Sequence, residues 1–261
     1  MSFEKYQLPK SLIWITIINY GYIDYTKNFL ISMNKCNVKF KLIIYCIDDQ
    51  SFNELQNYDN CIPIKVDFLN YNLPSEFKLW SNIDYKRICF AKLDAILYTL
   101  ENTYQLGIES VGFIDTDIVL FSDPSDTIIN MMNENKYINI FSQCDESPNK
   151  FCSNPYNCRN LCAGIIIFRN VKNLYRFLKY PENEIDQFIN ADQDFLQQIF
   201  SNFNVPHLTV PKHIFPNGSY YQNLRNNKIE FEKSNVLIHF NYMIGHEKKE
   251  AMKLQNLWYL E

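Results

Sequence analysis

Two acidic residues, one position apart, interrupt an apolar run in the middle of the chain. Asp115 and Asp117 lie between the apolar stretches 111–114 and 118–121. Such a run predicts a strand buried on both faces, with the two carboxylates where it leaves its sheet. Carboxylates this close repel each other, and a shared proton or a divalent cation relieves the repulsion. Oxygen ligands favour a hard cation, Mg²⁺ or Mn²⁺. The alternative is a strand-end turn in which the aspartates cap backbone N–H groups.

A histidine and several cations follow near the end of the sequence. The apolar residues 236–240 predict a last strand, and His239 lies within it. A histidine at a strand end is either a satisfied structural residue or a metal ligand, and here two carboxylates are in need of a third partner. Gly245, Lys248 and Lys249 follow closely and supply a flexible backbone and positive charge, which suit a phosphate group.

The first half of the chain alternates strands and helices. The predicted elements are a strand over 11–18, a loop over 19–22, a helix over 25–34, a strand over 40–47, a strand over 61–66 and a helix over 84–100. This alternation predicts a mainly parallel sheet, in which ligands bind beyond the carboxyl ends of the strands. The loop at 19–22, the acidic pair at 48–49 and the central aspartates are therefore expected to share one crevice.

The second half is less regular. Its predicted elements are a helix over 125–132, a strand over 137–142, a polar loop over 143–159, a strand over 161–169, helices over 173–178 and 192–200, and the last strand. Asp192 and Asp194 open one of these helices, where acidic residues interact favourably with the helix dipole. Asp192 is therefore either the N-cap of this helix or a functional residue.

Length and charge limit the class of protein. With 261 residues, of which 47% are hydrophobic, the chain can form one large α/β domain. A net charge of −4 argues against nucleic acid or an anionic membrane as the main partner, although a small anionic ligand remains compatible with it. The apolar stretch 12–18 is much shorter than the ~20 residues that span a bilayer, and no signal-peptide pattern precedes it. We expect a soluble, cytoplasmic protein without a transmembrane segment.

The eight cysteines are scattered along the chain. Several lie inside apolar runs, which favours reduced thiols over a disulfide framework. A zinc site is the alternative for the four cysteines between 144 and 162, but their spacing lacks the short paired intervals of zinc motifs. We therefore expect free thiols, and Asn217-Gly218-Ser219 is then an unused glycosylation sequon.

Taken in order, these motifs resemble a known family. They are residues 16–21, Lys92, residues 113–117, Ala163-Gly164, Asp192-Gln193, residues 215–218, and residues 239–241 with Gly245 and Lys248. The series is similar to that of nucleotide-diphospho-sugar transferases with the GT-A fold. It resembles most the family of plant cell-wall xylosyl- and arabinosyltransferases, and more loosely glycogenin and the related galactosyltransferases.

The resemblance implies a fold and its division. The fold is α/β, a Rossmann-like GT-A domain over residues 1–261 with a mainly parallel central sheet and helices on both faces. Residues 1–121 would form the nucleotide-binding half. Residues 122–261 would form the half that binds the donor sugar and the acceptor, and the segment from 239 to 249 would be a mobile lid.

The resemblance also implies an activity. The chain would be a metal-dependent glycosyltransferase that moves a sugar from a nucleotide diphosphate sugar, with UDP-linked donors expected, to a hydroxyl group. The acceptor would be a glycan, a glycoprotein or a small molecule, and the anomeric configuration would be retained. Asp115, Asp117 and His239 would hold Mn²⁺ or Mg²⁺ at the donor diphosphate, where the ion neutralises charge on the leaving nucleotide.

Further roles follow from the same resemblance. Thr16, Asn19 and Tyr22 would hold the base and ribose, with Tyr22 stacking and Asp48 accepting a hydrogen bond from the base. Lys92, Gly245 and Lys248 would bind at the phosphates. Asp192 and Gln193, as the catalytic pair, would hydrogen-bond the hydroxyls of the donor sugar. Cys162 departs from the asparagine of the family's Asn-Ser-Gly or Asn-Thr-Gly motif and leaves the choice of donor sugar open.

Two other classes of function remain as alternatives. Residues 115–119 also fit the DxDx(T/V) signature of haloacid-dehalogenase-type phosphatases, in which the first aspartate is phosphorylated. That signature belongs to the first strand of its fold, whereas two β-α units precede it here. The other alternative is a non-catalytic protein that binds a nucleotide sugar or a carbohydrate.

Overall fold

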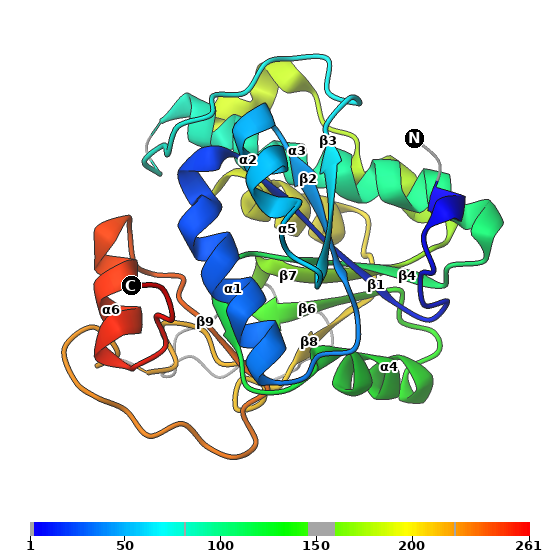
Figure 1. Cartoon of the computed structure of the whole chain (residues 1–261). Coiled ribbons are helices and arrows are strands. Elements are labelled where there is room, and N and C mark those ends of the chain that lie inside the picture. The colour runs from blue at the N-terminus through cyan, green and yellow to red at the C-terminus, as the bar shows by residue number, and fades with distance from the viewer. Residues whose placement is uncertain (1–2, 81, 146–159, 222) are drawn as a thin grey trace.

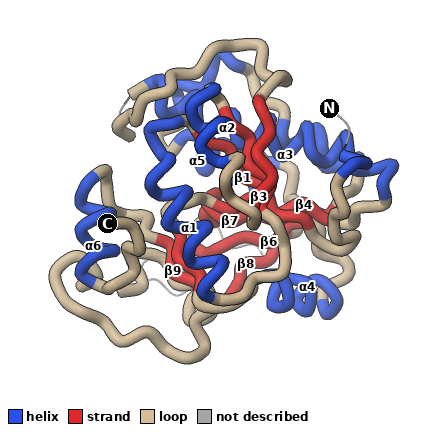
Figure 2. Tube along the Cα trace, in the orientation of Figure 1, coloured by secondary structure: helices blue, strands red, loops and turns tan. Residues whose placement is uncertain are grey.

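The molecule is built around a seven-stranded sheet, which lies at the centre of the computed structural model (Figures 1 and 2). The structure describes residues 3–80, 82–145, 160–221 and 223–261. The strand order is β3-β2-β1-β4-β7-β6-β8. The strands are β1 (Ile13–Ile18), β2 (Leu42–Cys46), β3 (Cys61–Lys65), β4 (Ser110–Ile114), β6 (Ile140–Cys144), β7 (Leu161–Arg169) and β8 (His207–Val210).

Most neighbouring strands of this sheet run parallel. The pairs β1–β2, β1–β4, β2–β3 and β6–β8 are parallel, and β7 is antiparallel to both of its neighbours, β4 and β6. The strands of the first half are buried along almost their whole length, as expected for β-branched runs covered on both sides. The predicted α/β fold with a mainly parallel sheet is therefore confirmed.

Helices cover both faces of the sheet. On one face, α3 (Ile83–Thr103) and α5 (Ala191–Asn202) contribute Phe90, Leu93 and Leu196 to a shared core. On the other face, α1 (Ile23–Lys35), α2 (Asp49–Leu55) and α4 (Pro124–Glu134) contribute residues such as Phe29 and Ile128 to a second core. The two cores sandwich the sheet and fix the strand ends at which the polar residues gather.

A second, two-stranded sheet corrects one expectation. The apolar run 111–121 is not one strand, because β4 ends at Ile114 and β5 (Ile118–Leu120) begins a new sheet with β9 (Leu237–His239). The aspartates lie in the connection between the two sheets. The predicted position at a strand exit is thus confirmed, although the strand is divided.

Other differences concern polar or short elements. Helices α2 and α6 (His246–Leu254) were not predicted, since few apolar residues recur in them at helical spacing. The strand expected from 137 begins only at Ile140, and the helix expected over 173–178 is the 3₁₀ segment η4 (Lys172–Leu178). The remaining 3₁₀ segments are η1 (Phe3–Lys5), η2 (Tyr20–Tyr22), η3 (Tyr104–Leu106) and η5 (Glu182–Gln187). Within the described ranges, no helix is both long and apolar enough to cross a bilayer.

Candidate functional site

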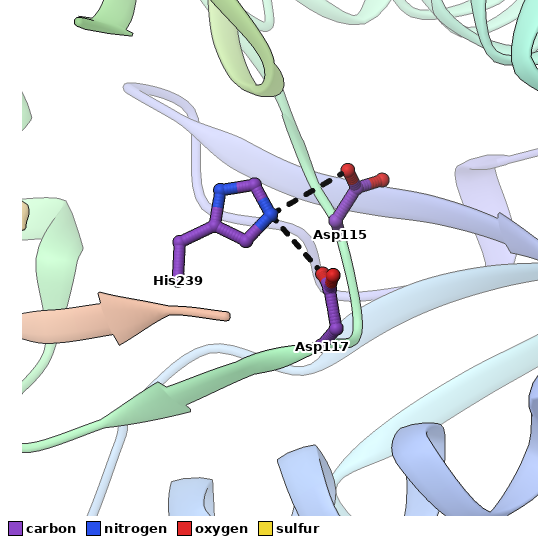
Figure 3. A group of neighbouring side chains, drawn as sticks. All are labelled: Asp115, Asp117 and His239. Atoms are coloured by element: carbon purple, nitrogen blue, oxygen red, sulfur yellow. Dashed lines mark ion pairs between the residues drawn. The ribbon is translucent and has the colours of Figure 1, made fainter. Parts of the chain in front are cut away.

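Three potential metal ligands converge between the two sheets (Figure 3). His239 Nε2 lies 3.2 Å from Asp117 Oδ1 and 3.9 Å from Asp115 Oδ2. One ligand atom from each residue lies within 4.8 Å of the others, and this is the only such group of three or more in the part of the chain that the structure describes. Two carboxylates and one imidazole nitrogen are a donor set that suits Mn²⁺ well and accepts Mg²⁺.

Backbone pairing brings these residues together from distant parts of the sequence. The register of β5 with β9 places His239 opposite Ile118, next to Asp117. The N–H of Phe240 donates to the Asp117 carbonyl at 3.0 Å, and the N–H of Asp115 donates to the Gly164 carbonyl at 2.7 Å. The site is therefore held by strand pairing and does not depend on a flexible loop.

A lysine from α6 completes the charge balance at Asp117. Lys248 Nζ forms an ion pair with Asp117 Oδ2. Burial alone would raise the pKa of Asp117, but the ammonium group of Lys248 and the neighbouring His239 hold the pKa of this carboxyl well below its usual value. Asp117 is thus a carboxylate throughout the physiological pH range and is available as a ligand.

The wall behind the three ligands has no room for a side chain. A Cβ atom added at Gly164 would lie 2.3 Å from His239 Cε1 and 2.6 Å from Asp115 Oδ2. Contacts this short do not occur, so only glycine allows both side chains to occupy their positions. The close approach of the backbone, together with the donor set, fits a bound divalent cation.

A buried lysine links the candidate metal ligands to α5. Lys92 Nζ lies 3.3 Å from Asp115 Oδ1 and 3.4 Å from Asp192 Oδ2. Burial opposes the charged form of Lys92, but the two carboxylates raise its pKa above the usual value. Burial raises the pKa of Asp192 to about 6, even though Lys92 counteracts this. Asp192 is not the N-cap of α5, because Asn190 occupies that position.

A cavity of about 500 Å³ opens in front of these groups. Its volume is that of a small-molecule site. It brings together ten of the twelve residues expected in the site, with the acids and both lysines next to one another. These residues are Thr16, Tyr22, Lys92, Asp115, Asp117, Asp192, Gln193, His239, Gly245 and Lys248.

Asn19 and Asp48 do not line this cavity. Asn19 is buried, and its amide donates to the carbonyls of Pro74 and Glu76 at 2.7 and 3.0 Å. Asp48 caps α2 by accepting from the N–H of Ser51, and its other oxygen accepts from the N–H of Tyr20. Both side chains bond backbone groups of neighbouring loops, and neither is placed in the cavity, where the expected contacts with the base or ribose would be made.

One side of the cavity holds a network around an acid that the sequence analysis missed. Gln193 donates to Asp145 Oδ2 at 2.9 Å and accepts from the N–H of Ala163. Asn241 donates to Asp145 Oδ1 at 2.9 Å and to the sulfur of Cys162 at 3.8 Å. Burial raises the pKa of Asp145. Asp145 lies near the start of the polar loop predicted at 143–159, where a lone acid gives no sequence signal.

The cysteines agree with the expectation as far as they are described. Cys36, Cys46, Cys61, Cys89, Cys144 and Cys162 are all free of disulfides. Burial raises the pKa of Cys46 to about 12, which makes this thiol unreactive. Cys152 and Cys158, which the zinc alternative requires, lie outside the described residues.

Comparison with protein families decides the classification. Residues 41–252, most of the chain, match the model of the nucleotide-diphospho-sugar transferase family. The chain belongs to this family. The match covers all three candidate metal ligands and both site lysines, and it agrees with the resemblance seen in the sequence. No curated protein sequence matches the chain.

Solved glycosyltransferases share the fold of this nucleotide-diphospho-sugar transferase. The bifunctional glycosyltransferase WbbM matches 96% of the chain at 13% identity and a TM-score of 0.56, and GlyE of Streptococcus pneumoniae TIGR4 matches 96% at 12% identity and 0.57. The chain spans only 50% of WbbM and 62% of GlyE. Galactosyltransferase LgtC, solved with donor and acceptor sugar analogues, matches 94% of both chains at 13% identity and a TM-score of 0.53. The GT-A fold is therefore confirmed.

The phosphatase alternative fits neither the family match nor the topology. Asp115 follows β4, the fourth strand of the chain, whereas the phosphatase signature requires the first strand. The family model likewise describes sugar transferases.

Besides Asp145, the sequence analysis missed Gln143, Phe77 and Trp80. Phe77 and Trp80 line the cavity as parts of a loop whose course depends on tertiary contacts.

Proposed function

We propose that this transferase moves a sugar from a UDP-linked donor to a hydroxyl group and that it requires Mn²⁺. The observation that carries the proposal is the convergence of Asp115, Asp117 and His239 within a cavity that also contains Lys92 and Lys248. Carboxylates and an imidazole next to two cations suit a metal–diphosphate complex, in which the metal needs ligands and the phosphates need positive charge.

Each residue of the cluster has a specific task in this proposal. Asp115, Asp117 and His239 would hold the cation, which supplies electrostatic stabilisation of the departing nucleoside diphosphate. Lys248 would turn from Asp117 toward a phosphate oxygen once the cation neutralises that aspartate. Lys92 stays between Asp115 and Asp192 and keeps both carboxylates oriented.

The donor sugar would occupy the side of the cavity lined by Asp145, Asp192 and Gln193. Their oxygens and amide groups suit sugar hydroxyls. The uridine would lie toward Thr16 and Tyr22, in the half formed by residues 1–121. The acceptor, a glycan, a glycoprotein or a small alcohol, would enter from the half formed by residues 122–261, and residues 239–249 would cover the donor.

Retention of the anomeric configuration is part of the proposal. It is supported by the resemblance to retaining families and by the state of three of the four acids in the cavity lining, since Asp115, Asp117 and Asp192 each pair with a cation. The fourth acid, Asp145, accepts hydrogen bonds from Gln193 and Asn241. None of the three paired acids is free to act as the base that inversion requires. Proton NMR of the fresh product distinguishes the two outcomes, because the coupling of its anomeric proton reports the configuration.

Ligand-induced stabilisation tests the donor and the metal together. The full chain is heated with a panel of nucleotide diphosphate sugars, with Mn²⁺ or with EDTA. A donor at about 100 times its Kd should stabilise the protein by about 2.7 kcal/mol. We expect stabilisation by a UDP-sugar only with Mn²⁺, and none in Asp117→Asn. Equal stabilisation in EDTA would contradict the metal requirement, and a response to another nucleotide alone would contradict the UDP donor.

Two adjacent lysines provide a matched pair for the phosphate contact. Lys248 pairs with Asp117 inside the cavity, whereas Lys249 points to Asp24 and to the ring of Trp258. Lys248→Ala should weaken UDP binding about tenfold or more while uridine binding changes little, because only UDP carries the phosphates that this cation contacts. Lys249→Ala should bind both ligands as the parent does. An equal loss for uridine and UDP in Lys248→Ala would remove this lysine from the phosphate site.

A further inference from the structure

Gln143 is a fully buried polar residue next to the candidate metal centre that the proposed mechanism has not used. It lies in β6, where the pairing with β7 changes register between Ser142 and Gln143. Irregularities of this kind redirect side chains and are common beside active sites. Here the amide of Gln143 is directed at His239, and its Oε1 lies 2.7 Å from His239 Nδ1.

The surroundings of Gln143 fix which end of its amide faces the histidine. Gln143 Nε2 lies 3.0 Å from the carbonyl oxygen of Phe215 and 3.2 Å from that of Pro216. Carbonyl oxygens only accept hydrogen bonds, so the NH₂ group must face them. The opposite end of the amide, which faces His239, is therefore the oxygen, an acceptor without a proton.

This orientation determines the proton on His239. An amide oxygen at 2.7 Å requires a donor, so Nδ1 of His239 carries the proton. Asp117 Oδ1 is also an acceptor and faces Nε2, but it lies at 3.2 Å, farther than the Gln143 oxygen at 2.7 Å, and its carboxylate is already paired with Lys248. In the neutral ring, the lone pair then lies on Nε2, the nitrogen that faces Asp117 and Asp115. The other polar neighbour of Nδ1, the sulfur of Cys162 at 3.7 Å, is more distant and a weak partner.

We infer that Gln143 is a positioning residue that holds His239 as the Nδ1–H tautomer and thereby directs the Nε2 lone pair at the metal centre. The metal part of this inference rests on the proposed function, whereas the tautomer does not. The arrangement follows from the packing of the chain itself, because two main-chain carbonyls orient the glutamine and the glutamine orients the histidine. An outer ligand partner of this kind typically contributes tenfold to a hundredfold to metal affinity.

The tautomer can be read without any metal. The chain has only four histidines, so long-range ¹H–¹⁵N NMR resolves their rings, and His239→Gln identifies the signal of residue 239. The pH is raised until the ring nitrogen shifts stop changing, so that the neutral form is observed. We expect a protonated, pyrrole-type Nδ1 and an unprotonated, pyridine-type Nε2 in the parent. A parent with the proton on Nε2 would overturn the inference.

A substitution that removes the oxygen but keeps the shape of the side chain tests the dependence on Gln143. In Gln143→Met, the Nδ1–H preference of residue 239 should be lost, and the affinity for Mn²⁺ alone, measured from the EPR signal of the free ion, should fall about tenfold to a hundredfold. Unchanged ring shifts and unchanged Mn²⁺ affinity would show that Gln143 is merely structural.

A control separates positioning from stability. Asn170 is also buried, bonds Thr103 and Tyr175, and lies directly after the opposite end of β7 from Cys162. Asn170→Leu should lower the melting temperature but leave the His239 signals and Mn²⁺ affinity as in the parent. A matching loss of affinity in Asn170→Leu would refute the specific role of Gln143. A parent with Nδ1–H that binds no Mn²⁺ would refute the metal centre of the proposed function and uphold the tautomer assignment.

Discussion

Gly164, which lies behind the candidate metal centre, allows the most direct test of the site. In Gly164→Ala, the new methyl group meets His239 Cε1 at 2.3 Å and Asp115 Oδ2 at 2.6 Å. The ring and the carboxylate must each move by about 1 Å to reach ordinary van der Waals contact. Overpacking of this kind costs about 1–3 kcal/mol of folding stability. A displacement of about 1 Å in a reacting group costs roughly 100-fold in rate.

Gly112 provides the matched control. It lies in β4, and an added Cβ would meet the ring of Trp14 at 2.7 Å, away from the metal ligands. Each kcal/mol lowers the melting temperature of a chain this long by about 2–4 °C. We expect both alanine variants to melt at lower temperature, but only Gly164→Ala to lose Mn²⁺-dependent binding of UDP in calorimetric titrations. If Gly164→Ala binds Mn²⁺ and UDP like the parent, the close packing of the wall against the ligands does not matter for the site.

Three further predictions concern buried charge and thiols. Lys92→Met leaves Asp115 and Asp192 without their cation and should lower the free energy of unfolding in urea by about 3–5 kcal/mol, whereas Lys92→Arg should lose less. The pKa of Asp192 is raised to about 6, so the folded protein binds a proton at this residue more readily than the unfolded chain does. Between pH 4 and 6, the free energy of unfolding should therefore fall as pH rises, and Asp192→Asn should flatten this slope. Thiol titration of the denatured, unreduced protein should find close to eight free cysteines, and disulfides or stoichiometric zinc would contradict this.

The sequence was sufficient for the parts of the fold that depend on local pattern. Buried strands such as β7 and long amphipathic helices such as α3 have apolar residues at the spacing of their own secondary structure, so they could be located from the chain alone. Helices α2 and α6 could not, because they are short or polar and are stabilised by what they pack against. The division between β4 and β5 was also missed, since a run of apolar residues does not say which sheet each part joins.

The same distinction explains which site residues could be recognised. Asp115 and Asp117 could be recognised from the sequence, because two acids one position apart in an apolar run require a counter-charge. His239 was predicted as a metal ligand only from the order of motifs in the family resemblance, because a single histidine at a strand end is also compatible with a structural role. Gln143 carried no signal at all, since its role depends on the carbonyls of Phe215 and Pro216, more than seventy positions away, and on a change of register that no spacing reveals.

Asn19 and Asp48, which the resemblance places at the base and ribose, instead bond the backbone of the loops around the cavity. Asn19 holds the carbonyls of Pro74 and Glu76, and this fixes the segment that places Phe77 against Tyr22, with ring centroids 4.9 Å apart. Tyr22 and Phe77 both line the cavity, so Asn19 shapes the proposed nucleoside pocket by orienting residues that face it. Asp48 acts in the same way on the N–H of Tyr20. A polar residue at a strand end therefore indicates which loop lines a binding cavity. Which side chains of that loop face the cavity depends on tertiary contacts that the sequence pattern does not reveal.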